Sequence, residues 1–81
     1  MTIRVLFFGV LAHEVGQGEA TLDLSDNATV GDALSALADV YPPISRFQSR
    51  LATAVNLEYV GSDHFLSDND ELAVIPPVSG G

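Results

Sequence analysis

The residues best suited to do chemistry lie at the end of the sequence, in the run Pro76-Pro77-Val78-Ser79-Gly80-Gly81. Glycine has no β-carbon, so Gly80 and Gly81 can thread a channel too narrow for any side chain. A terminal carboxylate held in such a channel can approach a nucleotide bound by another protein. The Pro76-Pro77 pair stiffens the start of this segment and lowers the entropy cost of inserting it. The pattern predicts an extended prong that reacts in a partner's active site, and the alternative is a frayed tail without function.

Elsewhere the usual catalytic groups are few. The sequence has no cysteine and no lysine, because its three basic residues are all arginines, so it offers neither a thiolate nucleophile nor a Schiff base. For His13 and His64 we expect a structural role rather than acid–base catalysis. The four carboxylates between residues 63 and 71 lack the spacing of a calcium loop and indicate a solvated turn. The chain does not read as a self-contained enzyme, and we expect it to bind no metal or cofactor.

The amino-acid composition limits the classes of partner and the cellular compartment that we expect for this chain. Eleven carboxylates oppose three arginines, which gives a formal net charge of −8. A chain without a basic stripe lacks the electrostatic footprint of nucleic-acid binding, and an anionic membrane surface would repel it. The apolar run from Val5 to Ala12 is too short to span a bilayer, and no signal-peptide cleavage site follows it. We therefore expect a cytoplasmic protein that binds neither nucleic acid nor membrane.

Two strands are predicted in the first third of the chain, which at 81 residues has room for one small domain. Thr2 to Gly9 has apolar residues on both faces, as a central strand does. Glu19 to Ser25 alternates apolar and polar residues, as a half-buried strand does. The glycine-bearing connection between them indicates an antiparallel hairpin, and Val10 to Val15 within it fits an irregular segment or a helical turn.

One main helix is predicted after this hairpin. Apolar residues recur from Val30 to Tyr41 with the spacing of an amphipathic helix. Thr29 is the expected N-cap, with Asp32 in place to complete a weak capping box. Pro42-Pro43 should end the helix. The following stretch, Ile44 to Leu51, fits either a short helix or a turn.

The rest of the sequence predicts two returning strands, Ala52 to Leu57 and Glu71 to Ile75. Between them, Glu58 to Phe65 fits a loop or an irregular strand, and Asn69 is expected to adopt the left-handed backbone conformation in a turn. The element order predicts an α+β roll in which one helix covers a mixed sheet of roughly four to five strands. We predict a single domain over residues 1–77, followed by a flexible tail over residues 78–81.

Several segments spread over the whole chain carry a resemblance to a known family. The most specific is Asp70 to Gly81, with its ending Pro-Pro-Val-Ser-Gly-Gly, and the others are Ile3 to Phe8, Thr29 to Leu34, Ala54 to Tyr59 and Leu66 to Asp70. Together they resemble the small subunit of molybdopterin synthase, a ubiquitin-like sulfur carrier. That family often has glycine where this chain has Asn69, and asparagine tolerates the same backbone.

The resemblance implies a β-grasp fold and a mechanism that depends on other proteins. In this family an activating enzyme adenylates the terminal carboxylate with ATP and magnesium, and a sulfur donor converts the acyl-adenylate to a thiocarboxylate. Carried onto this chain, Gly81 holds the sulfur and Gly80 gives access to it. The tail then enters the large catalytic subunit of the synthase, in a heterotetramer. Sulfur passes to cyclic pyranopterin monophosphate, which becomes molybdopterin.

The resemblance also implies where partners make contact. They would touch the tail residues Pro76, Pro77, Val78 and Ser79 and, on the domain, Phe8 together with Leu6. Core packing is the alternative role for Phe8. Other functions that stay open are a sulfur carrier for tRNA thiolation or thiamin synthesis, a protein modifier, and a binding module whose tail has no function.

Overall fold

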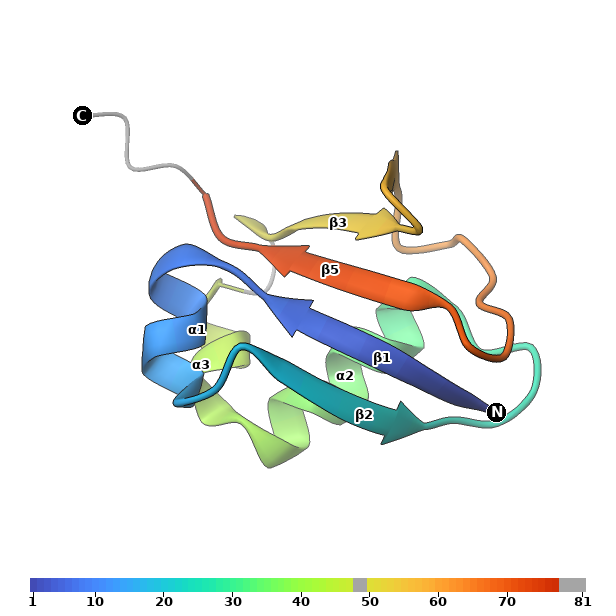
Figure 1. Cartoon of the computed structure of the whole chain (residues 1–81), viewed down its shortest axis with the longest axis horizontal. Helices are drawn as coiled ribbons and strands as arrows, with labels where there is room; N and C mark the ends of the chain where they lie inside the picture. Colours follow the sequence, from blue (N-terminus) through green and yellow to red (C-terminus); the bar gives the residue numbers. More distant parts are fainter. Residues whose placement is uncertain (48–49, 78–81) are drawn as a thin grey trace.

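A computed structural model describes residues 1–47 and 50–77 of the chain. Within these ranges the chain forms one five-stranded sheet and three helices. The strands are β1 (Thr2–Phe7), β2 (Glu19–Asp23), β3 (Ala52–Val55), β4 (Glu58–Val60) and β5 (Glu71–Ile75). The helices are α1 (Gly9–Val15), α2 (Val30–Val40) and α3 (Pro42–Phe47). Of these, α2 and α3 are drawn behind the sheet in Figure 1 and α1 at its left end.

The strand order is β2-β1-β5-β3-β4, which places the last strand in the middle of the sheet. β1 pairs with β2 antiparallel and with β5 parallel, and β3 pairs antiparallel with both β4 and β5. This mixed sheet, with an N-terminal hairpin and one long helix across it, is the predicted α+β roll of the β-grasp type. The hairpin prediction is also confirmed, although its connection contains the complete helix α1 rather than a single turn.

The core lies between the sheet and the helices. Alternation along β1 directs Ile3, Val5 and Phe7 toward the helices, where all three are buried. Leu72 and Val74 are their neighbours on β5 and are fully buried. Because β5 is covered on both edges and on this face, its position and the direction in which it leaves the sheet are held by the whole core.

Helix α2 begins and ends where the sequence predicts. Thr29 is its N-cap: its Oγ1 accepts a hydrogen bond from the Asp32 amide (3.2 Å), and the Thr29 amide donates to Asp32 Oδ2 (2.9 Å). The capping box is therefore complete. Pro42 follows the C-cap Tyr41 and starts α3, because proline has no amide hydrogen to lose in a first helical turn. Of the predicted segment Ile44 to Leu51, the residues up to Phe47 therefore form a short helix, and residues 48–49 lie outside the described residues.

Two turns contain residues with a left-handed backbone. Asn69 has φ 69°, as expected from the sequence. The β3–β4 turn consists of Asn56 (φ 50°) and Leu57 (φ 74°). Of the segment Glu58 to Phe65, for which the sequence left a loop or an irregular strand open, Glu58–Val60 is strand β4 and a loop follows it. Hairpin turns with two positive φ angles favour Asn-Gly, and a bulky residue in this conformation costs about 1 kcal/mol or more. Leu57 therefore sits in a strained position.

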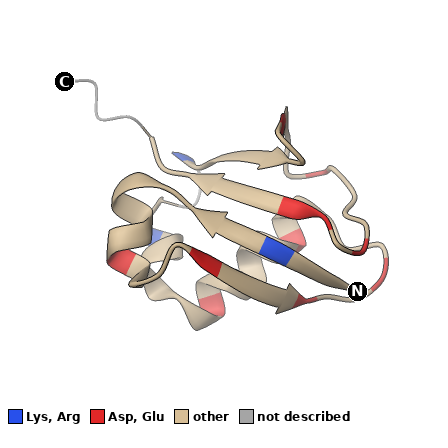
Figure 2. Ribbon diagram, in the orientation of Figure 1, with Lys and Arg blue, Asp and Glu red and all other residues tan. Residues whose placement is uncertain are grey.

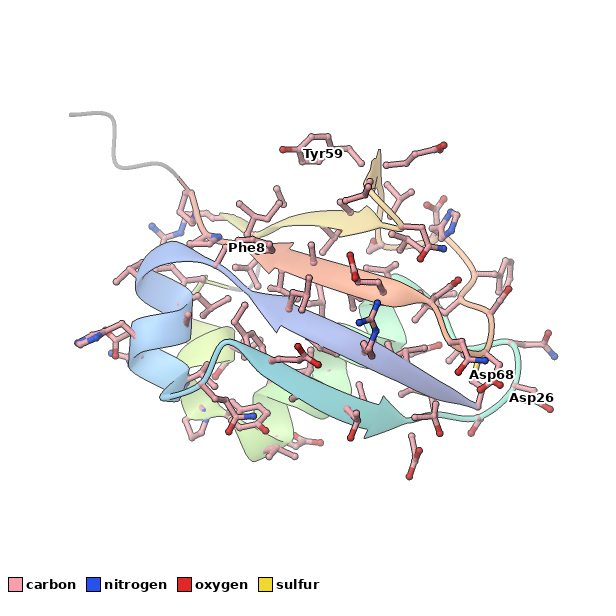
Figure 3. All side chains as sticks on the ribbon, viewed as in Figure 1. Phe8, Asp26, Tyr59 and Asp68 are labelled. Carbon is pink, nitrogen blue, oxygen red and sulfur yellow. The ribbon has the colours of Figure 1, made fainter. Side chains whose placement is uncertain are left out.

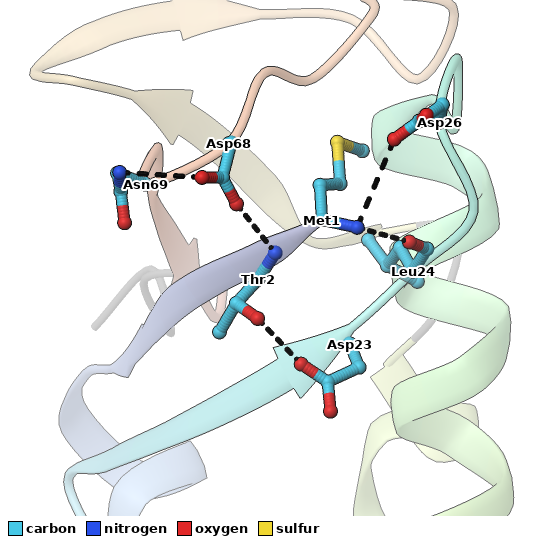
Figure 4. Close-up of polar contacts among 7 residues, drawn as sticks. All are labelled: Met1, Thr2, Asp23, Leu24, Asp26, Asp68 and Asn69. Atoms are coloured by element: carbon cyan, nitrogen blue, oxygen red, sulfur yellow. Dashed lines mark hydrogen bonds and ion pairs between the residues drawn. The ribbon is translucent and has the colours of Figure 1, made fainter.

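The N-terminal end of the chain is fixed by polar contacts (Figure 4). The Met1 amine donates a hydrogen bond to the Leu24 carbonyl (2.8 Å) and lies 3.8 Å from Asp26 Oδ1. The Thr2 amide donates to Asp68 Oδ1 (2.8 Å). Since β1 and β5 are parallel, these contacts lie at the end of the sheet opposite to the point where β5 leaves it (Figure 1).

Candidate functional site

The predicted reactive segment starts where β5 ends at Ile75. The structure places Pro76 half-buried against the domain and Pro77 exposed beyond it. The predicted residues Val78, Ser79, Gly80 and Gly81 lie outside the described residues. The described part of the site is therefore the platform from which the terminal segment leaves, here called the tail exit (Ile75, Pro76 and Pro77).

The start of α1 forms a seat for the tail exit. The Phe8 amide donates to the Val74 carbonyl (3.3 Å), which extends the contact between β1 and β5 by one residue. Gly9 follows with φ 57°, a conformation that glycine adopts without cost. A β-carbon on Gly9 would lie 3.5 Å from Cγ of Pro76, so the proline ring lies directly over this glycine. These contacts fix the direction in which the chain leaves the sheet.

The face of the sheet turned away from the helices carries apolar side chains next to the tail exit. The register brings Leu6 beside Ala73, Ala73 beside Ala54, and Ala54 beside Tyr59. Ala52 lies beside Ile75 in the next row. We call these residues and Phe8 the open-face stripe (Leu6, Phe8, Ala52, Ala54, Tyr59, Ala73 and Ile75).

Two aromatic side chains of the open-face stripe are accessible to a partner. Phe8 is 45% exposed and Tyr59 is 77% exposed, and both are labelled in Figure 3. Phe8 is thus not one of the buried core residues, which speaks against the core-packing role considered above. Tyr59 was not predicted as a site residue, because the sequence around it fits a loop as well as a strand and gives no facing direction. Leu6 is half-buried on the same face.

Charges border the open-face stripe at the end away from the tail exit. Arg4 of β1 and Glu71 of β5 are register partners, and Arg4 Nη2 donates to Glu71 Oε2 at 2.8 Å. In Figure 2 this pair stands out on two strands whose remaining length toward the tail exit is uncharged. A partner surface that covers the stripe can therefore be apolar at its centre and polar at this border.

Other chemistry-bearing groups are dispersed. His13 on α1 and His64 in the loop after β4 are both exposed. Over residues 1–47 and 50–77, no three His, Asp or Glu side chains come together in a way that could hold a metal ion. The helices in these ranges all fall short of the length and hydrophobicity that crossing a membrane requires.

The sequence is similar to known proteins along almost its whole length. Residues 5–81 match the model of the ThiS family. The chain is 36% identical over 83 residues to a molybdopterin synthase sulfur carrier subunit from Chlamydomonas reinhardtii, covering all of both chains.

Solved structures of the same fold agree over the whole chain. The structure of small archaeal modifier protein 1 from Haloferax volcanii superposes with a TM-score of 0.90 at 32% identity, over all of both chains. One chain in a complex of subunits 1 and 2 of molybdopterin-converting factor from Helicobacter pylori superposes over its full length with a TM-score of 0.70 at 22% identity, which supports the fold. The chain therefore belongs to the ThiS family, among the ubiquitin-like sulfur carriers.

Proposed function

We propose that this chain is the sulfur carrier subunit of a molybdopterin synthase, with the carboxylate of Gly81 as its reactive group. The observation that carries the proposal is the similarity to molybdopterin synthase sulfur carrier subunits along the whole chain. The ending Pro-Pro-Val-Ser-Gly-Gly supports it, because two glycines can enter a narrow active site that side chains would block.

The proposed chemistry follows from the low reactivity of a carboxylate. A Gly81 oxygen attacks the α-phosphorus of ATP on an activating enzyme, with magnesium bound there, and pyrophosphate leaves. Hydrosulfide from a sulfur donor then attacks the acyl carbon and AMP leaves, so the chain ends in a thiocarboxylate. The thiocarboxylate sulfur is a good nucleophile, and a docked domain can position it through the terminal residues that carry it. Transfer of the sulfur to cyclic pyranopterin monophosphate and addition of water regenerate the Gly81 carboxylate.

The geometry of the domain supports a docking role in this reaction. The tail exit is held by Gly9 and the core, and the open-face stripe offers apolar area around it. We propose that the stripe contacts the large catalytic subunit, by analogy with the Helicobacter complex of two subunits, while the tail occupies that subunit's active site. The chain itself supplies no catalytic side chain in this proposal. Its net charge of −8 would speed encounter with partners that have basic docking faces.

Intact-mass measurement tests the proposal directly. The full chain with a native C-terminus is incubated with an activating enzyme of this family, ATP, magnesium and a sulfide source. We expect the mass increase of an exchange of one oxygen for sulfur, located at Gly81 by fragmentation. A chain that lacks Gly81 is the control and should show no exchange. If the activating enzyme thiocarboxylates the carrier protein of its own organism but leaves this chain unchanged, the proposal is wrong.

A second function is a ubiquitin-like carrier or modifier for another pathway. The close superposition on a small archaeal modifier protein favours it. The two functions share the activation step and differ in the molecule that accepts the sulfur or the acyl group. The thiocarboxylated chain should therefore be mixed with a molybdopterin synthase large subunit and cyclic pyranopterin monophosphate. Formation of molybdopterin supports the first function. An isopeptide bond to lysines of added proteins, formed without molybdopterin in a parallel sample that keeps the activating enzyme and ATP, supports the second.

A further inference from the structure

We propose that this chain has a second docking site, on the opposite face of the sheet from the open-face stripe, which takes an arginine or lysine side chain of a partner protein together with an adjacent apolar side chain. The site is a pocket of about 380 Å³ between the β3–β4 hairpin and the loop that leads to β5, here called the hairpin pocket. The proposal stands on the pocket, its exposed apolar rim and its charges, and it does not depend on the proposed function.

The hairpin pocket has an apolar wall and an acidic rim. Val55, Val60 and Phe65 line the wall, and Asn56, Glu58 and Asp70 contribute polar groups at the rim. Glu58 is the register partner of Val55, whose side chain is buried on the helix side of the sheet. The pocket therefore opens on the helix side of the β4 edge, and the open-face stripe lies on the other face.

Hydrogen bonds fix both sides of the hairpin pocket before anything binds. The Asn56 side chain donates to Asp70 Oδ1 (2.9 Å) and accepts from the Glu71 amide (3.0 Å). On the loop side, the Val30 amide donates to the His64 carbonyl (2.9 Å) in the neighbourhood of Phe65. Phe65 itself forms an antiparallel bridge with Thr29. A pocket with fixed walls loses little entropy when a ligand enters.

Two large apolar side chains are mostly exposed at or near the hairpin pocket: Phe65 lines it, and Leu57 lies between the lining residues Asn56 and Glu58 in the sequence. Leu57, at the hairpin tip, is 90% exposed, and Phe65 is 65% exposed. The turn would be better formed with glycine at position 57, because φ there is 74°. Leucine therefore contributes neither to the turn nor to the core at this position. Contact with a partner protein would give Leu57 a role that it lacks in the isolated domain.

The charges around the hairpin pocket indicate which kind of partner binds there. The ion pairs among the described residues do not include Glu58 or Asp70, and no arginine lines the pocket. A second copy of this chain, with a net charge of −8, would be repelled. A guanidinium or ammonium group beside Glu58, with its stem on the Phe65 ring, would gain both an ion pair and a cation–π contact. The occupant is therefore a basic segment of another protein with an apolar side chain next to its cation.

The location of the hairpin pocket allows two partners to bind at once. Along β3, Ala52 pairs with Ile75 at the tail exit, and Val55 pairs with Leu72 at the pocket end. Three residues of strand separate these pairs by about 10 Å, and the two surfaces are on opposite faces of the sheet. A protein that holds the tail can leave the hairpin pocket open to another protein.

Titration of the full chain with a short peptide tests the inference. The probe is the tripeptide N-acetyl-Arg-Leu-Arg-amide, followed by amide chemical shifts of the ¹⁵N-labelled chain. We expect shifts concentrated at Asn56, Glu58, His64 and Phe65. Glu58→Gln and Leu57→Gly should each weaken binding about fivefold or more, because each removes one of the two proposed contacts. Glu19→Gln removes an exposed carboxylate at the opposite edge of the sheet and should leave binding unchanged.

Three outcomes would overturn the inference. One is shifts spread evenly over the acidic surface, and another is equal binding of N-acetyl-Glu-Leu-Glu-amide. The third is concentration-dependent shifts at the same four amides without peptide, since a second copy would then be the occupant. Leu57→Gly keeps a favourable turn, so loss of binding in that variant does not reflect unfolding. Oxygen-to-sulfur exchange at Gly81, measured on the same variants, separates failure here from failure of the proposed function.

Discussion

The two ends of the sheet are held together in different ways. At the tail exit, the contacts are a backbone hydrogen bond from Phe8 and the packing of Pro76 on Gly9, next to exposed apolar side chains. At the opposite end, side-chain oxygens bind backbone amides: Asp68 accepts from Thr2 and Asp70 accepts from Ser67. Short polar side chains thus hold the loops at one end, while the other end keeps an apolar surface free for partners.

This difference predicts that substitutions at the two ends have opposite consequences. Changes at the tail exit should alter reactions with partners and leave the free energy of unfolding nearly unchanged. Changes among the polar contacts should lower the free energy of unfolding and leave the tail reactive. The following experiments test that separation, beginning with the largest expected effect.

Deletion of Gly81 should abolish thiocarboxylation completely, because the new terminal carboxylate on Gly80 would be one residue short of the activated nucleotide. The thermal unfolding midpoint should not change. Intact-mass spectrometry and a thermal melt measure the two quantities on one sample. Gly80→Ala is the milder companion and should slow exchange without preventing it. Full exchange in the deletion variant would show that Gly81 is not the reactive residue.

Replacement of Asp70 by alanine should lower the free energy of unfolding by about 2 kcal/mol, because two donors lose their acceptor. These are the Ser67 amide and the Asn56 side chain. Urea denaturation followed by circular dichroism measures the change. Asp39→Ala removes an exposed carboxylate on α2 and should cost less than about 0.5 kcal/mol. Equal losses in the two variants would contradict the structural role of Asp70.

Phe8→Ala should weaken binding to the large subunit about tenfold, because a half-exposed aromatic ring at the edge of a docking surface would be buried in the complex. Isothermal titration calorimetry measures the dissociation constant. Val40→Ala is the matched control: Val40 is also apolar and is 62% exposed, but it lies on α2. Similar effects of both variants would mean that the open-face stripe has no special role.

Leu57→Gly should raise the free energy of unfolding by about 1 kcal/mol, because glycine removes the left-handed strain and no buried contact is lost. Asn69→Gly is the comparison: Asn69 has a similar φ of 69°, but asparagine tolerates it, so the change should be near zero. A loss of stability in Leu57→Gly would show that the leucine packs against the domain.

Arg4→Gln should cost only about 0.5 kcal/mol, because its ion pair with Glu71 is partly exposed. The difference between the variant and the parent chain should vanish at about 1 M salt, where the charges are screened. Denaturation at low and high salt measures it. A difference that persists at high salt would point to packing of the arginine stem rather than charge.

Much of the fold could be predicted from the sequence because local patterns determine it. The alternation in β1 and β2, the apolar spacing of α2 and the capping box at Thr29 each depend on residues close together in the chain. Asn69 was predicted correctly for the same reason. Val10 to Val15 and the start of the segment Ile44 to Leu51, which each had two possible interpretations, became helices α1 and α3, and α3 ends at Phe47. Tertiary packing decides such short elements.

Residues of the candidate site could be predicted from the sequence only where they follow one another in the chain. The terminal glycines and prolines are contiguous, so the sequence indicates their chemistry. Tyr59 and the hairpin pocket depend on the register of the β3–β4 hairpin, which the sequence does not fix, and a one-residue slip would turn each side chain to the other face. Gly9 gives no signal as a seat for Pro76, because the two residues are far apart in the sequence and only the pairing of β1 with β5 brings them together.

The parallel pairing of β1 with β5 also determines how the domain responds to force. β5 has a neighbour on each edge, and the chain leaves the sheet at the C-terminal end of this strand, after Ile75. A pull on the tail therefore loads the backbone hydrogen bonds on both sides of β5 in shear, all together instead of one after another. An edge strand pulled outward from the sheet would lose them singly. The domain should therefore resist a pull on its C-terminal end better than a domain whose last strand lies at a sheet edge.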